Sequence, residues 1–384
     1  NEANNQAYRD VVVNPGPATI TPPPTAELPS TSGEVSAPLG APAESVSPLV
    51  AEPETLPQAQ PVAALGPISP ANAGRVIEIA AMLGHGGTIT GLDFNAAGTL
   101  LASSSRDGTA RLWDVYLQSE VLILAGHNDR VQDVAFSPLG DQIASASLDG
   151  TVRLWDAASG TSLLALAHGA PVERTAFSPD GSRVASAGEN PDAGGGLSGL
   201  TRVWDARTGA EIGSIQTFGL VTGVGFLSNS TLAITTAARD CSLGGGEVAL
   251  YDIGAPEAAL LTLAEGPTFD RLAVDAATGL IAASSQQDIC AGNAVARVWT
   301  SGGALTAALD HGSNAVTGLA FNSGGTLLAT TTIDGSVRLW DLGTSTQVAA
   351  LSAGGTVETV AFSPDGTRLA SGGAADAVLL WGVG

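Results

Sequence analysis

The chain has 384 residues, of which 44% are hydrophobic and only 14% are charged, and 37 acids against 15 bases give a formal net charge of −22. All the bases are Arg, because the sequence contains no Lys. A P-loop nucleotide site and a Schiff-base enzyme are therefore excluded, since both depend on a Lys side chain. The negative charge also disfavours binding to nucleic acid or anionic lipid. No run of 18 apolar residues occurs, so the sequence predicts no transmembrane segment.

Residues 1–74 hold 14 of the 21 prolines, with Ser, Thr, Ala and Glu between them. A segment of this composition buries too little apolar surface to offset its ordering entropy, so we expect an extended Pro-rich arm or linker. The exception is a β-prone stretch near the start of the arm. It is the part of the arm that we expect to contact neighbouring subunits, through Tyr8, Val11, Val12 and Val13.

Residues 75–384 are built from seven repeats, each marked near its end by an aromatic residue. These markers follow one another at intervals of 41 to 49 residues: Trp113, Trp155, Trp204, Tyr251, Trp299, Trp340 and Trp381. A second marker precedes each of them: Phe94, Phe136, Phe177, Phe226, Val274, Phe321 and Phe362. Short alternating stretches and Gly/Asp turns fill the intervals, so each repeat is predicted to form four short strands of an all-β fold.

These residues resemble the WD-repeat family of β-propellers, in a style that looks bacterial and secreted. The resemblance covers residues 75–384 and implies a seven-bladed propeller. In that family a His, a tight-turn Asp and the Trp share a hydrogen-bond network with a strand hydroxyl, so these residues have a structural role. The residues that correspond to this network are His85, His127, His168, His311, Asp107, Asp149, Asp334, Trp113, Trp155 and Trp340.

The last repeat ends after its third strand, at Trp381, and one strand is left over in front of the first repeat, at residues 76–80. We expect the leftover strand to pair with residues 378–381. This pairing closes the ring and protects sheet edges that would otherwise invite aggregation.

Three consecutive repeats, the third to the fifth, are longer than the others. The extra residues fall between the second and third strands, in the segments 187–200, 239–247 and 286–292, which we expect to form a crest on one face. Cys241 and Cys290 occupy matching places in this crest, so we predict a disulfide, and with it an oxidising compartment. The acidic residues of the crest leave Ca²⁺ binding open, although no calcium-loop pattern supports it.

We predict no catalytic residue, no cofactor and no metal site, because each His has a structural interpretation and no nucleophile-elbow motif occurs. The leading interpretation is a non-enzymatic scaffold or assembly subunit, extracellular or at the cell surface, whose arm binds copies of itself in a filament or layer. One alternative is the sensor ectodomain of a bacterial membrane protein such as a Ser/Thr kinase. The other is an extracellular propeller enzyme with an acidic site in its central channel.

Overall fold

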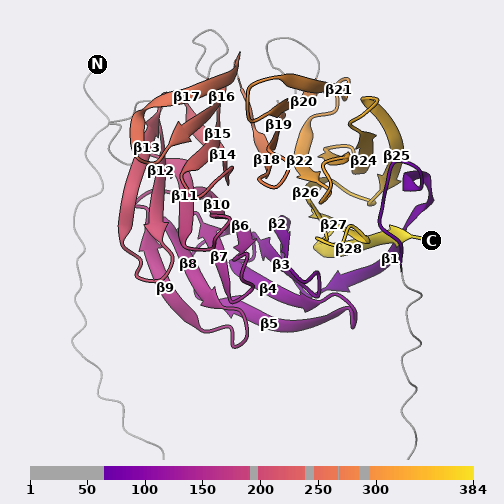
Figure 1. Ribbon diagram of the computed structural model, residues 1–384. Coiled ribbons are helices and arrows are strands. Elements are labelled where there is room, and N and C mark those ends of the chain that lie inside the picture. Colours follow the sequence, from indigo (N-terminus) through magenta and orange to yellow (C-terminus); the bar gives the residue numbers. More distant parts are fainter. Residues whose placement is uncertain (1–64, 191–197, 238–245, 267, 285–293) are drawn as a thin grey trace, which may run out of the picture. The chain divides into compact units, whose positions relative to one another are not determined.

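The computed structural model describes residues 65–190, 198–237, 246–266, 268–284 and 294–384. The chain divides into two compact units, residues 1–58 and 59–384, and every described residue belongs to the second. The described residues form seven antiparallel sheets of four strands each, arranged as blades around a central channel (Figure 1). The prediction of an all-β, seven-bladed propeller is therefore confirmed.

The first two strands of each blade lie nearest the channel. The innermost strands are β2 (Ile89–Phe94), β6 (Val131–Phe136), β10 (Val172–Phe177), β14 (Leu220–Phe226), β18 (Arg271–Asp275), β22 (Val316–Phe321) and β26 (Val357–Phe362). The second strands are β3 (Leu100–Ser105), β7 (Gln142–Ser147), β11 (Arg183–Glu189), β15 (Thr231–Ala237), β19 (Leu280–Ser284), β23 (Leu327–Thr332) and β27 (Arg368–Gly373).

The other two strands of each blade lead to the rim. The third strands are β4 (Thr109–Asp114), β8 (Thr151–Asp156), β12 (Gly199–Asp205), β16 (Gly246–Asp252), β20 (Val295–Thr300), β24 (Ser336–Asp341) and β28 (Ala377–Val383). The outermost strands are β5 (Ser119–Ala125), β9 (Ser162–Ala167), β13 (Glu211–Thr217), β17 (Ala255–Gly266), β21 (Leu305–Asp310), β25 (Thr346–Ser352) and, in the last blade, β1 (Val76–Leu83).

The hydrophobic core lies between neighbouring blades. In one such layer Leu112 and Leu124 of the first blade pack with Phe136, Ile143 and Trp155 of the second. Both faces of a second strand are covered in this way, so these strands carry small or apolar residues at successive positions instead of alternating with polar ones. The buried run Leu101–Ser105 in β3 is an example.

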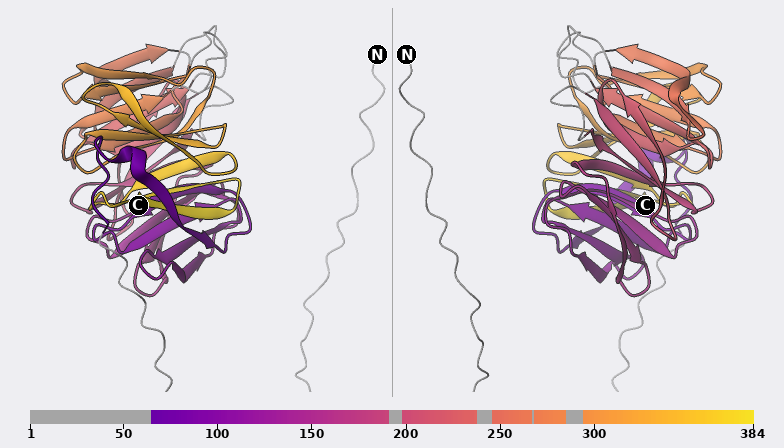
Figure 2. Two further views of the ribbon diagram at one scale, coloured as in Figure 1. Left: turned by 90° about the vertical axis from the view of Figure 1, so that its right-hand side faces the viewer. Right: turned by 90° about the vertical axis from the view of Figure 1, so that its left-hand side faces the viewer.

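Ring closure follows the sequence prediction. Strand β1 pairs antiparallel with β28, with Val76 opposite Val383 and Leu83 opposite Ala377. In Figure 2 the indigo strand β1 lies beside the yellow strands of the last blade. The first strand of the propeller is thus the outermost strand of its last blade, and the prediction that residues 76–80 close the ring is confirmed.

Residues 65–74 belong to the packed propeller, although the sequence interpretation placed them in the arm. The amide of Ile68 donates a 2.7 Å hydrogen bond to the carbonyl of Gly366, and the side chain of Ile68 is only 2% exposed. The chain then forms the short 3₁₀ helix η1 (Ala73–Arg75), in which Ala73 is fully buried against the last blades. These apolar contacts explain why the packed part begins before residue 75.

The described residues contain no helix with the length and apolar character that crossing a bilayer requires.

Candidate functional site

The first blade contains the side-chain network that joins a His, an Asp, a Trp and a strand hydroxyl. His85 Nδ1 lies 2.8 Å from Asp107 Oδ2, and its Nε2 lies 2.8 Å from Ser103 Oγ. Trp113 Nε1 donates to the same Ser103 oxygen over 2.8 Å. The network therefore links the entry to the first strand, the tight turn after the second strand, and the third strand.

The second blade repeats this arrangement. His127 Nδ1 lies 2.9 Å from Asp149 Oδ2. Ser145 Oγ lies 2.7 Å from His127 Nε2, to which it donates, and it accepts from Trp155 Nε1 over 2.8 Å. Neither imidazole has solvent-exposed side-chain surface. Each ring nitrogen is occupied, so these two histidines have no free position for catalysis or for a metal.

The electrostatics of the network favour a carboxylate beside a neutral imidazole. Burial alone would raise the pKa of Asp107, but hydrogen bonds from Thr109, His85 and the Gly86 amide outweigh it and lower that pKa to about 2. The pKa of Asp149 is likewise lowered to about 2. Burial lowers the pKa of His85, against the opposing effect of Asp107. At neutral pH the network therefore acts as a fixed structural clamp.

In the third blade the network is shorter. His168 is fully buried, its Nδ1 lies 2.9 Å from Ser186 Oγ, and Trp204 Nε1 donates to the same oxygen. Among the described residues no hydrogen-bond partner reaches His168 Nε2. Burial lowers the pKa of His168 to about 4. The ring is thus neutral and enclosed, which again indicates a structural role.

The sixth blade departs from the predicted network. His311 Nε2 lies 2.9 Å from the hydroxyl of Thr330, whose oxygen accepts from Trp340 Nε1, but His311 Nδ1 donates to the backbone oxygen of Leu309 over 2.9 Å. Asp334 instead binds groups of its own turn: Thr332 Oγ1, the amide and hydroxyl of Ser336, and Arg338. The prediction that Asp334 joins the histidine does not hold here.

An extra residue explains this difference. Four positions separate His85 from the first residue of β2, whereas five separate His311 from the first residue of β22. The longer connection places the imidazole differently relative to the turn, so the backbone satisfies its Nδ1 instead. The spacing from His to the Phe marker, which is nine residues in the first three repeats and ten in the sixth, would have shown this in the sequence.

The three enlarged connections follow β11, β15 and β19, as predicted, but most of their residues lie outside the described part of the chain. This applies to Cys241 and Cys290, so the disulfide stays a prediction, and to the arm residues Tyr8, Val11, Val12 and Val13. Glu247 is described, and its carboxylate accepts a 2.7 Å hydrogen bond from the Tyr251 hydroxyl. Among the described residues no group of three or more His, Cys, Asp or Glu is arranged to hold a metal ion.

The inner edges of the blades are linked by side chains that reach from one blade to the next. Thr90 Oγ1 donates to the carbonyl of Val131 over 2.6 Å, and Asp93 Oδ2 accepts from the Phe136 amide over 2.7 Å. Asp133 Oδ2 accepts in the same way from the Thr175 amide. Backbone groups that face the channel, and would otherwise form open strand edges, are thereby satisfied.

The innermost strands also carry charged side chains of both signs. Arg271 donates to the carbonyls of Thr317 and Asp270, and Arg174 donates to the carbonyl of Glu173. Burial, with the nearby positive charge of Arg174, lowers the pKa of Arg271 to about 10. The sequence interpretation considered an acidic channel, but the described channel also contains these two arginines.

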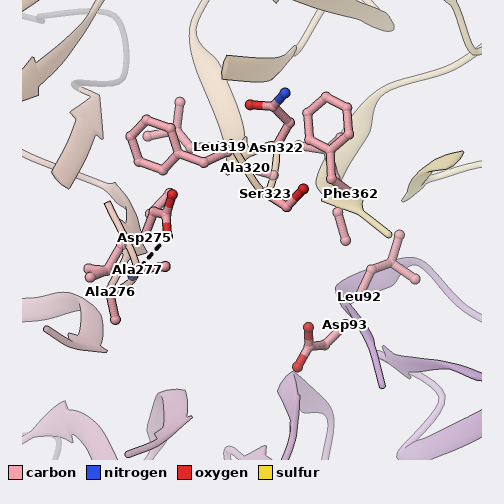
Figure 3. Close-up of a pocket in the computed structure, with 15 residues that line it drawn as sticks. Leu92, Asp93, Asp275, Ala276, Ala277, Leu319, Ala320, Asn322, Ser323 and Phe362 are labelled. Atoms are coloured by element: carbon pink, nitrogen blue, oxygen red, sulfur yellow. Dashed lines mark hydrogen bonds between the residues drawn. The ribbon is translucent and has the colours of Figure 1, made fainter. Parts of the chain in front are cut away.

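A hollow of about 480 Å³ opens where strands β2, β18, β22 and β26 end (Figure 3). Its apolar lining includes Leu92, Leu319 and Phe362, and its only acidic residues are Asp93 and Asp275, on opposite sides of the open centre. The enlarged connections begin at the other ends of the blades, because β11 runs antiparallel to β10. The ends of β11, β15 and β19, where the enlarged connections begin, therefore lie on the face opposite the hollow.

Asp93 was missed by the sequence interpretation. It stands one residue before the Phe marker of its repeat, where the six other repeats carry Ala or Gly: Ala135, Ala176, Gly225, Ala273, Ala320 and Ala361. Burial, with the nearby charge of Asp133, raises its pKa to about 7. The six equivalent positions all carry small residues, so aligning the seven repeats with one another would have revealed this single acid.

The rim carries the outer edges of the blades. In β5 the side chains of Val121 and Ile123 are 47% and 48% exposed, while Leu124 is buried. Within the described residues, no backbone hydrogen bond outside the β4–β5 ladder reaches this strand. β5 is therefore a largely apolar strand whose outer edge no other described strand covers.

Together, the closed ring of four-stranded blades and the His–Asp–Ser–Trp network define a propeller whose repeats are stabilised from within. The family model described as WD domain, G-beta repeat matches residues 78–114, 118–156, 303–341 and 345–381, which correspond to the first, second, sixth and seventh blades. The three blades between them have the same four-stranded architecture. The chain is a WD-repeat β-propeller with seven repeats, a class that typically serves as a non-enzymatic scaffold for protein interactions. No curated protein matches the chain with significant sequence similarity.

Proposed function

We propose that the protein is a non-enzymatic assembly subunit that acts outside the cell or at its surface. In this proposal, the segment Tyr8–Val13 of one copy adds as a strand to the outer edge of β5 in another copy. Such a contact is head-to-tail, so repeating it builds a filament or a layer.

The observation that carries the proposal is the free apolar edge of β5. An edge strand with exposed backbone groups and β-branched side chains is a template for an added strand, and soluble proteins usually protect such edges with charges, prolines or short lengths. The run Val121–Leu124 carries none of these protections. By contrast, β17 contains Pro256, Glu257 and Glu265, and β13 contains Gly213 and begins with a glutamate.

The net charge of −22 supports a contact of this kind. Copies with so much like charge repel one another, so association needs a local interaction that does not add to the repulsion. Main-chain hydrogen bonds and apolar side chains provide it, and the three consecutive valines Val11–Val13 match the apolar edge. The stiffness of a Pro-rich connection reduces the entropy lost when the segment docks.

Placement outside the cell rests on the predicted disulfide between Cys241 and Cys290, because such bonds persist in oxidising compartments. The test of the extracellular location is therefore separate from the test of assembly, and either proposal can fail without affecting the other.

Light scattering after size-exclusion chromatography tests assembly. We expect the full chain to form concentration-dependent oligomers and the variant lacking residues 1–14 to be a folded monomer. The double variant Val121→Lys, Ile123→Lys should also be monomeric, whereas Leu305→Lys on β21, which is 55% exposed, should assemble like the parent. The proposal fails if the truncated chain assembles normally, or if the β5 and β21 variants behave alike.

A further inference from the structure

We infer that the hollow at the end of the channel binds a small organic ammonium ion, with the Asp93 carboxylate facing the cation and the apolar wall covering its hydrocarbon part. This site is independent of the proposed assembly contact on β5. The argument rests on an acid that the repeat does not require, on the composition of the wall, and on the exclusion of other ligands.

The repeat pattern does not require an acid at position 93. Its carboxylate accepts the Phe136 amide, but the repeats with Ala or Gly at this position leave the equivalent amides of Phe177, Phe226, Phe321 and Phe362 without a side-chain acceptor among the described residues. The ring closes without such a bond in those blades. An acid kept at one of seven equivalent positions, facing a cavity, is better explained by a ligand than by blade packing.

Asp93 lacks a cationic partner. Its hydrogen bonds come from backbone amides, and within the described residues no arginine forms an ion pair with it. The charged group that faces it is another acid, Asp133 of β6. Burying a carboxylate without a counter-ion is costly, so a cation in the hollow would be favoured.

The opposite wall contains apolar side chains that are incompletely covered, beside the polar residues Asp275, Asn322 and Ser323. Val274, Phe321 and Phe362 are half-buried there, whereas the equivalent Phe94 and Phe136 are 5% and 6% exposed. Most of the residues that line the hollow belong to the fifth to seventh blades, and their exposed hydrocarbon would be removed from water by a ligand. Aromatic rings near a cation add a further attraction.

Other ligand classes fit poorly. A Ca²⁺ ion needs six or more oxygen ligands, but Asp275 binds groups of its own turn, at Ala277 and Thr278, and Asn322 Oδ1 accepts the amides of Thr326 and Leu327. An anion would face Asp93, and no arginine lines the hollow. An organic cation fits better, because its charge can pair with Asp93 while its hydrocarbon part contacts the apolar side chains on the other side of the hollow.

The chain contains no Lys, so its side chains offer no ammonium group to fill the site. The ligand therefore comes from outside, either as a free amine or as a Lys side chain of a partner protein. Both have the same chemistry at the site, and separate probes distinguish them.

Isothermal titration calorimetry of the full chain with n-butylammonium chloride tests the inference, and a Gly-Lys-Gly peptide blocked at both ends tests the Lys source. Because Asp93 titrates at about 7, we expect affinity at pH 5.5 to be about 30-fold lower than at pH 8.5. Asp93→Asn should abolish binding of both probes at both pH values. The uncharged analogue n-butanol should bind no better to the parent than to the variant.

Asp133→Asn is the matched control, because Asp133 is the neighbouring channel acid and does not line the hollow. It should retain binding, and thermal melts should show both variants folded. The inference is overturned if Asp93→Asn binds n-butylammonium like the parent, if binding does not depend on pH, or if the parent shows no binding at millimolar concentrations.

Discussion

Val76 pairs with Val383, so a residue near the start of the described chain and one near its end form a single rung of the β1–β28 ladder. Strand β1 thereby covers the edge of β28, and the side chain of Met82, only 2% exposed, completes a core between the last and first blades. The stability of the whole ring depends on this closure, because without it an apolar strand edge would face solvent.

Truncation tests the closure. Removing residues 1–64 should leave the melting temperature unchanged, because the buried residues Ile68 and Ala73 ahead of β1 are retained. Removing residues 1–83 deletes β1 and should cause a large drop in stability with aggregation, seen by circular dichroism and light scattering. The milder variant Met82→Ala should cost about 2–5 kcal/mol of unfolding free energy. Equal melting temperatures for the two truncations would contradict this account.

We expect the free energy of interaction between the His and the Asp to differ between the second and the sixth blades. Since His127 contacts Asp149 directly, a double-mutant cycle with alanine at both positions should show a coupling free energy of about 0.5–3 kcal/mol. The same cycle on His311 and Asp334 should be additive within about 0.5 kcal/mol, because no hydrogen bond joins them. Urea denaturation of the four single and two double variants measures both values. Equal coupling in the two blades would refute the assignment.

Periodicity predicted seven blades, four strands in each blade and the closing strand, because a marker residue that recurs at regular intervals indicates a packing environment that recurs with it. The turn motif illustrates why: in Phe177–Gly181, Ser178 Oγ donates to Asp180 Oδ1, and Gly181 adopts a positive φ of 72°. These residues are dictated locally, by the turn itself.

What the sequence did not predict depends on contacts between distant segments. The amide of Ile68 donates a hydrogen bond to the carbonyl of Gly366, which lies almost 300 residues further along the chain. No local pattern in the Pro-rich stretch predicts this contact. At His311 the backbone oxygen of Leu309 takes the place of Asp334 as the partner of Nδ1, because one residue is inserted between His311 and the Phe marker of its repeat. The spacing of the Trp markers does not reveal this insertion. Asp93 replaces a small residue without changing the length of its repeat or either marker, so the spacing and the markers of the repeats give no sign of it.

The predicted disulfide can be checked by mass spectrometry without reduction. If Cys241 and Cys290 are bonded, the intact mass should be two hydrogens lower than after reduction, and the unreduced chain should not react with a thiol reagent in denaturant. A bond closing a loop of about 50 residues should stabilise the fold by about 4 kcal/mol in the chain-entropy treatment. Cys241→Ser and Cys290→Ser should then lose similar stability, and unequal losses would argue against a bond.

Asp93 should make the stability of the propeller fall as pH rises. The folded chain holds the Asp93 proton up to a pH of about 7, because burial raises this pKa from 3.8, so between these values the folded state binds more protons than the unfolded state. Asp93→Asn removes this effect, and its stability relative to the parent should increase from pH 4 to pH 7 by about 2–4 kcal/mol and then level off. Denaturation of parent and variant across this range provides the measurement. Burial lowers the pKa values of His168 and His311 to about 4, so these histidines make stability rise with pH. This contribution is the same in the parent and the variant, and it cancels when their stabilities are subtracted. If the difference in unfolding free energy between the variant and the parent does not change with pH, the pKa of Asp93 is not raised in the folded chain and this prediction is wrong.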